Sequence, residues 1–265
     1  MIHVTFDSNL FQNIVFPDNY KDDESSEHYW SINKLIKEER IVACISETIF
    51  IYEVIAKNER KRKLAQSKPK TSCATQANGS IVSMQMSIGP GANSHLFCHP
   101  ILYQYLEACR KMKVKVLRTP RIGTFVNDDL VDDDFLPDKR YEISKRHKRF
   151  FECLEFIEDN LKCGKNHMDT LIAPYEGRNV FSKIKNAPES DIKKVSQAMA
   201  EWADGDSVAA HYGYGNDYFC TRDIARGAGS KSIFSISNRA KLKKEFDISI
   251  IGLEDLVAYL EHINN

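Results

Sequence analysis

Short apolar runs that alternate with helical patterns constrain the fold of this chain more than any other feature. Residues 2–6 are apolar enough for a buried strand, residues 29–39 have the spacing of an amphipathic helix, and residues 41–45 form a second apolar run. Ser46 is placed to cap a further helix that runs to about residue 58. Strands that alternate with helices favour parallel pairing, so the sequence predicts an α/β protein with a central, mostly parallel sheet.

The middle of the chain is less regular. Residues 71–98 are rich in Ser, Gly, Ala and Asn and are expected to form a loop or a small excursion. Helical spacing then returns from Ile101, and residues 114–117 form another apolar strand. A long helix is expected from Tyr141 to Leu161. Its predicted buried residues are Phe150, Phe151, Leu154, Phe156 and Ile157.

The remaining elements are predicted from the same patterns. Residues 163–187 are expected to be irregular and residues 191–203 to be helical. The last expected elements are a strand at 232–236, a basic helix, a strand at 248–251 and a helix at 254–263.

The stretch from Gly205 to Gly229 carries the clearest functional signal. Asp206 is expected to begin a short helix of small residues, and an apolar strand at 218–220 then leads to Thr221, Arg222 and Asp223. Ligands of open α/β sheets bind beyond the carboxyl ends of the strands. Asp223 is therefore the first candidate site residue.

Asp7 follows the first strand in the same way, with Ser8 and Asn9 after it. Two interpretations of Asp7 are open. It is either a site carboxylate at a strand end or a residue that caps the following turn, because Asp, Ser and Asn all favour such positions.

Two glutamates lie on the helix expected after the second strand. Glu53 has apolar residues on both sides, and a buried carboxylate is costly unless it is paired or bound to a metal. Glu47 lies in the first turn, where the helix dipole explains it without a function. We therefore predict Glu53 as the site residue and keep Glu47 in reserve.

Asp7, Glu53, Asp206 and Asp223 lie on four different elements, each at a strand end or on a helix beside one. Brought together, they form a cluster of like charges that requires cations for neutralisation. Hard divalent ions with oxygen ligands, Mg²⁺ or Mn²⁺, match such a cluster. Two such ions can activate water and stabilise the leaving oxygen in phosphodiester hydrolysis.

At these positions the sequence resembles the PIN-domain nucleases. The matching segments are VTFDSN at Asp7, ETIFIYEV at Glu53, GDSVAAH at Asp206 and DYFCTRD at Thr221 and Asp223. SIFSISN and SIIGLEDLVAYL are similar to the last strand and helices of that family. The resemblance implies a Rossmann-like three-layer α/β/α sandwich with a central mostly parallel sheet.

The resemblance also implies a Mg²⁺- or Mn²⁺-dependent endoribonuclease with those four acids as catalytic and metal-binding residues. Thr221 is expected to position the site, with Asn9, Glu47 and Asp204 in support; Asp204 can replace or assist Asp206. Arg222 and Arg226 are the expected nucleic-acid contacts, and the Gly-rich loop around Arg226 is suited to approach a phosphate. His211 is interpreted as a core histidine in preference to a catalytic base.

Alternatives to this function stay open. The substrate is RNA or, with the same metals, DNA, because discrimination depends on contacts to the 2′-hydroxyl. A catalytically incomplete module that binds nucleic acid or protein is the alternative from another class. A nucleotide-dependent enzyme is disfavoured because the sequence has no phosphate-loop motif. Family members of this kind often act as toxins or in defence, with a regulatory protein partner or a homodimer as further possibilities.

The chain is longer than a compact member of that family. We expect one PIN-like domain whose core comprises residues 1–57, 99–119 and 190–265, elaborated by insertions at about 58–98 and 120–189. Basic segments at 59–63 and 145–149 are interpreted as solvated faces, with contact to a phosphate backbone as the alternative. An acidic segment at 128–134 lacks the spacing of a calcium loop.

Composition sets the remaining limits. The 265 residues include 37 basic and 37 acidic side chains, so net charge gives no general attraction to nucleic acid or membranes. No apolar run approaches the roughly 18 residues that span a bilayer, and no leader precedes the first strand, so a cytoplasmic protein is expected. The seven scattered cysteines suit reduced structural thiols, and Cys153, Cys163 and His167 do not have zinc-ligand spacing.

Overall fold

A sheet of five parallel strands is the centre of the computed structural model, which describes residues 1–48, 69–78, 81–90, 100–119, 140–223 and 232–264. The spatial order of the strands is β5-β2-β1-β6-β7. Their bounds are β1 (Ile2–Phe6), β2 (Ile41–Ser46), β5 (Lys115–Leu117), β6 (Tyr218–Cys220) and β7 (Ile250–Ile251). Every neighbouring pair in this sheet is parallel.

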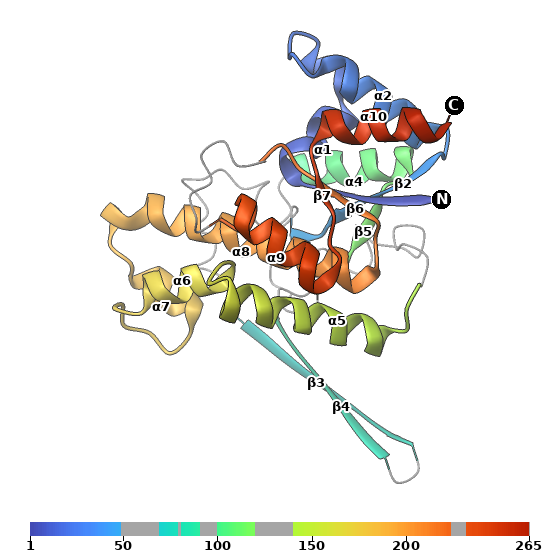
Figure 1. Ribbon diagram of the computed structural model, residues 1–265. Coiled ribbons are helices and arrows are strands. Elements are labelled where there is room, and N and C mark those ends of the chain that lie inside the picture. The colour runs from blue at the N-terminus through green and yellow to red at the C-terminus, as the bar shows by residue number, and fades with distance from the viewer. Residues whose placement is uncertain (49–68, 79–80, 91–99, 120–139, 224–231, 265) are drawn as a thin grey trace.

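Helices cover both faces of the sheet (Figure 1). One layer contains α1 (Ser8–Val15), α2 (Ser26–Lys37), α4 (Pro100–Met112) and α10 (Leu253–Asn264). The other contains α5 (Ile143–Glu155), α8 (Ile192–Tyr214) and α9 (Ile236–Phe246). The predicted three-layer α/β/α sandwich is confirmed, with a sheet that is entirely parallel.

Shorter elements complete the described fold. Two further helices are α6 (Lys165–Ile172), which lies beside α8, and α7 (Val180–Asn186), which lies next to α6. The short turns are η1 (Pro17–Tyr20), the π-helical η5 (Phe156–Asn160) and η6 (Glu189–Asp191). No helix among the described residues is long and apolar enough to cross a membrane.

The register of the sheet brings the strand ends to one edge. Phe6 of β1 lies opposite both Ile45 of β2 and Cys220 of β6. The residues that follow these three strands therefore leave the sheet at neighbouring points. Asp7 and Thr221 are two of those residues, so the topology itself positions polar groups at the carboxyl edge.

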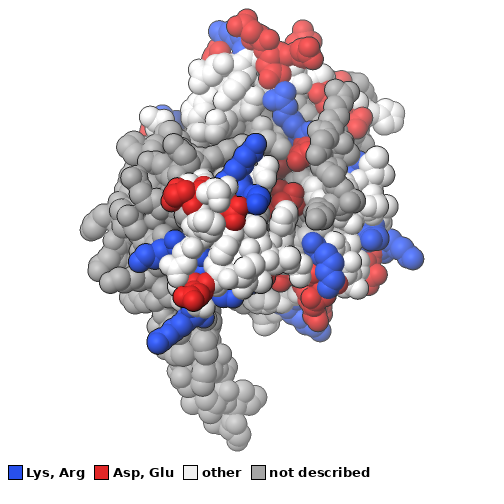
Figure 2. Space-filling model, turned by 90° about the vertical axis from the view of Figure 1, so that its left-hand side faces the viewer, with Lys and Arg blue, Asp and Glu red and all other residues white. Residues whose placement is uncertain are grey.

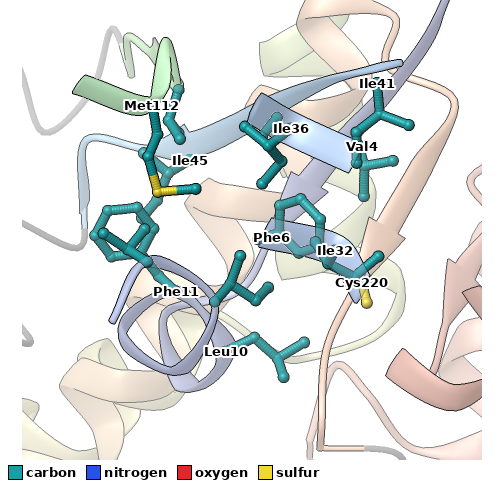
Figure 3. Packing of buried hydrophobic residues seen from close by; sticks show 14 of the residues in the cluster. Val4, Phe6, Leu10, Phe11, Ile32, Ile36, Ile41, Ile45, Met112 and Cys220 are labelled. Carbon is teal, nitrogen blue, oxygen red and sulfur yellow. The ribbon is translucent and has the colours of Figure 1, made fainter. Parts of the chain in front are cut away.

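Alternation along the strands separates two apolar cores. Val4 and Phe6 point to the layer of α1, α2, α4 and α10, where they pack with Leu10, Phe11 and Ile32 (Figure 3). Burying an aliphatic or aromatic side chain of this size contributes about 1.5–3 kcal/mol. On the opposite face, the core lies between the sheet and α5, α8 and α9. Its fully buried members include Cys44, Val208, Phe219 and Ile233.

A third apolar cluster lies within the region predicted to be irregular. Residues 163–187 contain α6 and α7, which pack on the first half of α8 through Met168, Ile172, Ile184 and Trp202. The prediction of irregular structure is therefore wrong. The signal that it missed is local: Asn179 and Ser182 form a capping box that begins α7.

Other elements also differ from expectation. Part of the segment at 71–98, expected to be a loop or a small excursion, is an antiparallel hairpin of β3 (Pro69–Asn78) and β4 (Ile81–Pro90), which extends away from the sheet (Figure 1). The expected strand at 232–236 is a turn that leads into α9. Phe151, predicted to be buried, is 48% exposed, and Phe156 is only partly buried. α5 ends at Glu155, and η5 continues it.

The cysteines agree with the predicted structural role. Those with described side chains are buried thiols that form no disulfide with one another, namely Cys44, Cys109, Cys153, Cys163 and Cys220. Burial raises the pKa of the Cys44 thiol to about 12. Burial likewise raises the pKa of the Cys163 thiol to about 11. Thiols with such pKa values remain protonated and are poor nucleophiles at neutral pH.

Candidate functional site at the carboxyl edge of the sheet

Asp7 and Thr221 meet where two neighbouring strands end. The Thr221 hydroxyl donates a hydrogen bond of 2.6 Å to Asp7 Oδ2, and Asp7 N donates to the carbonyl of Cys220 at 2.9 Å. Both side chains are buried. The predicted convergence of strand-end residues is observed for this pair, although 214 positions separate them in the sequence.

Thr221 uses its full hydrogen-bonding capacity. Its single proton goes to Asp7, while its oxygen accepts from Asp223 N at 3.0 Å and from Asn9 Nδ2 at 3.3 Å. Asn9 Nδ2 also donates to Asp7 Oδ2 at 3.0 Å. One hydroxyl thus fixes Asp7 relative to the segment that carries Asp223, and Asn9 supports both partners.

Asp7 has a second role in the fold. Its Oδ1 accepts from Ser8 N at 2.7 Å and caps α1. The capping interpretation is therefore confirmed, and it does not compete with the contact to Thr221 because each role uses a different carboxylate oxygen. An N-cap carboxylate is also favoured by the positive end of the helix dipole.

The surroundings of Asp7 shift the pKa of its carboxyl in opposite directions. Burial raises the pKa of the Asp7 carboxyl, the hydrogen bonds from Thr221 and Ser8 lower it, and the negative charge of Asp223 raises it further. The first and last of these effects disfavour the ionised carboxylate. A cation placed between Asp7 and Asp223 would relieve both.

Asp206 was predicted to begin a short helix. This prediction is wrong, because Asp206 lies in the middle of α8. α8 runs without a break through Gly205. A Cβ atom on Gly205 would lie 3.1 Å from Gly164 Cα. The glycine therefore permits α8 to pack closely on the segment before α6, and it does not end a helix.

The buried Asp206 carboxyl lies next to a contact between α8 and β2. The following residue, Ser207, places its hydroxyl 2.7 Å from Thr48 Oγ1, and Thr48 Oγ1 donates to Ser46 Oγ at 2.9 Å. This chain of hydroxyl groups connects α8 to the carboxyl end of β2, the neighbour of β1. Asp206 is fully buried and Asp204 is partly buried.

Glu201 is a residue that sequence reasoning did not select. Burial raises the pKa of its carboxyl, hydrogen bonds from Ile233 and Ser232 lower it, and the charge of Asp223 raises it. Among the described residues, its buried Oε2 atom has no hydrogen-bond partner. The available signal was its spacing of one helical turn from Asp204, which puts two acids on one side of α8.

Glu47 has structural partners at the other side of β2. Its Oε1 accepts from Thr119 N at 2.8 Å and from Thr119 Oγ1 at 3.1 Å, and Arg118 Nε lies 3.1 Å from its Oε2. Thr119 and Arg118 follow β5, whereas Asp7 contacts the segment after β6. These contacts explain the buried Glu47 without a catalytic role. Glu53 and Arg226 lie outside the described residues.

His211 is a core histidine, in agreement with the preferred interpretation. Its Nδ1 lies 2.9 Å from Thr5 Oγ1, and its ring packs edge-on against Phe219. Asn216 Nδ2 donates to the same threonine at 2.8 Å. Burial lowers the pKa of His211 to about 3, so the ring is neutral at physiological pH.

The described acids form a chain of repulsive pairs. The charge of Asp223 raises the pKa of both Asp7 and Glu201, so Asp223 repels each of these carboxylates. Within the described part of the chain, no three Asp, Glu, His or Cys side chains lie close enough to hold a metal ion. Glu53 lies outside the residues to which this statement applies.

Surface charge is mixed on the face shown in Figure 2, where the described Lys and Arg side chains are interspersed with Asp and Glu. Two of the basic side chains at the start of α5 make contacts within the protein. Arg149 donates to the carbonyl of Tyr212 at 3.0 and 2.8 Å, and Arg146 lies over the ring of Tyr214. Lys145 and Lys148 are exposed, as expected for a solvated face.

Comparison of the chain with protein-family models, with curated proteins and with solved structures gives no match.

Proposed function

We propose that this protein is a PIN-like, divalent-metal-dependent nuclease that hydrolyses phosphodiester bonds, with RNA as the substrate. The observation that carries the proposal is the joint fixation of Asp7 and Asp223 by Thr221 at the carboxyl edge of a parallel sheet. That edge is where α/β proteins of open-sheet topology bind ligands. The repulsion between the two acids is the electrostatic condition that a bound cation removes.

The donor groups fit a hard cation. Asp7 and Asp223 offer carboxylate oxygens, which Mg²⁺ and Mn²⁺ prefer over nitrogen or sulfur. Glu201 brings a further carboxylate close to Asp223, with one buried oxygen that lacks a hydrogen-bond partner among the described residues. Asp206 and Glu53 are proposed to complete the ligand set, as the resemblance to the nuclease family implies. When bound, the metal supplies Lewis-acid activation of water and stabilises charge on the phosphate.

The residues of the chain have distinct proposed roles. Asp7 is held through both oxygens, by Ser8 N on one side and by Thr221 and Asn9 on the other, so its orientation is set before any ligand binds. Thr221 and Asn9 are positioning residues. Arg222 supplies positive charge one residue before Asp223, where a phosphate group would bind.

The closest alternatives keep the same fold. A DNA nuclease needs only different contacts to the sugar, and a binding module needs an incomplete acid set. The proposed chemistry is compatible with a role as a toxin or defence effector and with a cytoplasmic location. It is also compatible with a regulatory protein partner or a homodimer.

Cleavage of labelled single-stranded RNA and DNA in Mn²⁺, Mg²⁺ or EDTA distinguishes these functions. The proposal predicts metal-dependent cutting of RNA that Asp7→Asn abolishes and that the exposed control Asp22→Asn retains. Cutting of DNA alone would establish the first alternative. An intact protein that binds RNA without cutting it in any metal would establish the binding module.

A further inference from the structure

Arg222 is supported by residues from a distant part of the chain. Its Nη2 atom lies 3.3 Å from both carboxylate oxygens of Asp23, and its guanidinium carbon lies 5.6 Å from the centre of the Tyr29 ring. Its backbone N–H donates to Asn9 Oδ1 at 3.3 Å. The cluster of Asp23, Tyr29 and Arg222 therefore joins the start of α2 to the exit of β6.

Asp23 is itself fixed in place. Its Oδ1 accepts from Ser25 N at 2.9 Å and from the Tyr29 hydroxyl at 3.2 Å. The hydrogen bond from Ser25 is the main cause that lowers the pKa of this carboxyl, and the charge of Arg222 lowers it as well. Tyr29 is fully buried. The Asp23 carboxylate is therefore ionised, and Ser25 and Tyr29 hold it in place independently of Arg222.

Only one edge of the Arg222 guanidinium faces Asp23. The Nε and Nη1 atoms have no hydrogen-bond partner among the described residues, and 39% of the side chain is exposed. An arginine presents its donors in a rigid planar fork, so fixing one edge also orients the other. The free donors lie on the residue between Thr221 and Asp223.

We propose that Asp23 and Tyr29 are positioning residues that orient Arg222 for contact with a phosphate group of the nucleic-acid substrate. This inference rests on the proposed function, which it extends from the acids to the binding of the substrate backbone. Preorganisation of Arg222 lowers the conformational entropy that the side chain loses on binding. The Asp23 carboxylate thus favours binding of an anion although its own charge is negative.

The opposite role for Asp23 makes a different prediction. If Asp23 acted as an internal competitor that occupies Arg222 in place of a phosphate, its neutralisation would strengthen binding. Asp22 is the matched control, because it is the neighbouring acid and is exposed, with no contact to Arg222 in the described structure. Asp22→Asn therefore measures the general effect of removing one negative charge here.

The test is fluorescence anisotropy of a labelled single-stranded RNA with the full chain, in EDTA and over a series of salt concentrations. Arg222→Gln should reduce the slope of log affinity against log salt by about 1, the signature of one lost phosphate contact. Asp23→Asn should weaken binding about two- to fivefold, the range expected for a partly exposed ion pair. Tyr29→Phe, which removes the bond to Asp23 and keeps the ring, should weaken binding in the same direction.

Asp22→Asn should not weaken binding, and Asp23→Asn should have no additional effect in an Arg222→Gln background. Thermal melts of each variant verify that the fold is retained. Binding by Asp23→Asn that equals or exceeds that of Asp22→Asn overturns the inference and leaves the proposed function intact. Wild-type protein that binds RNA with the predicted Arg222 and Asp23 effects, but never cuts it, overturns the nuclease and keeps the inference.

Discussion

Thr221 shows how one buried hydroxyl can hold three neighbouring groups in place. It is fully buried, and its hydroxyl serves Asp7, Asn9 and the backbone of Asp223 at once. A threonine is suited to this position because its methyl group fills apolar space while its hydroxyl donates one hydrogen bond and accepts two.

Replacing Thr221 by valine preserves the shape of the side chain and removes the hydroxyl. We expect a loss of about 1–3 kcal/mol in the free energy of unfolding, because Asp7 and Asp223 N each lose a partner. Metal-dependent cleavage should fall by about 10- to 100-fold, the typical effect of removing a group that orients a ligand. Denaturation and single-turnover cleavage measure the two effects.

The control is Thr170→Val, which removes a hydroxyl that donates to the carbonyl of Asn166 on the exposed side of α6. This variant should cut at the wild-type rate. A Thr221→Val protein with undiminished cleavage would show that the hydroxyl does not position the acids.

His211 predicts a pH dependence of stability. Its folded pKa of about 3 lies below the unfolded value of about 6.5, so the unfolded chain binds the proton more tightly. Stability is therefore fully present above pH 6.5 and is lost as the pH falls toward 3. At pH 5 the expected loss from this residue is about 2 kcal/mol. Urea denaturation of wild type and His211→Leu at pH 7 and pH 5 measures it.

The leucine variant lacks the titrating ring, so its stability should fall less between the two pH values than that of the wild type. Equal losses in both proteins would mean that His211 takes up a proton in the folded state. That result would contradict the buried, neutral ring packed against Phe219.

At the scale of elements, α8 carries three of the candidate acids. It contains Glu201, Asp204 and Asp206, and Ser207 links it to the end of β2. Its position depends on α5, because Arg149 donates two hydrogen bonds to the carbonyl of Tyr212 in the last turn of α8. The same guanidinium stacks 3.7 Å from the ring centre of Tyr212.

Arg149→Met should lower the free energy of unfolding by about 2 kcal/mol, since it removes charge-assisted hydrogen bonds and a cation–π contact. Lys148→Met is the matched control. Lys148 is the exposed neighbouring cation, and its partner Glu152 is 3.8 Å away. Its loss should stay below about 0.5 kcal/mol. Similar urea midpoints for the two variants would contradict a specific role of Arg149 at the end of α8.

The elements also show where sequence reasoning succeeds and fails. The strands at 2–6 and 41–45 were predictable because a strand buried on both faces must be a continuous apolar run. Asp206 was expected to begin a helix, whereas α8 runs through Gly205, and the glycine is explained by the close approach of Gly164, a contact between distant residues. The run at 232–236 contains Ile233 and Phe234, which lie in a turn and point into the core. Burial of apolar residues alone does not specify a strand.

The candidate site, like the fold, was predictable only in part. Asp7 and Asp223 could be selected because each follows an apolar strand, and the order of parallel strands puts their ends together. Two contacts could not be predicted from the sequence, namely that of Asp23 with Arg222 and that of Glu201 with Ser232. Both depend on loop conformations that no periodic pattern encodes.

At the scale of the whole molecule, the parallel sheet brings the two ends of the sequence together. Asp7 follows the first strand in the chain and Asp223 follows β6, yet one threonine contacts both. The helices that precede Asp223, together with α9 and α10 after it, form the two layers that bury the sheet (Figure 1). The central claim is that this convergence of acids exists to bind divalent cations.

Calorimetric titration of Mn²⁺ into the protein tests that claim most directly, with Asp223→Asn and the exposed control Asp22→Asn titrated in parallel. We predict saturable binding by the wild type and by Asp22→Asn, weakened about tenfold or more in Asp223→Asn. Absence of Mn²⁺ binding by the wild type, or equal binding by Asp223→Asn, would contradict the claim.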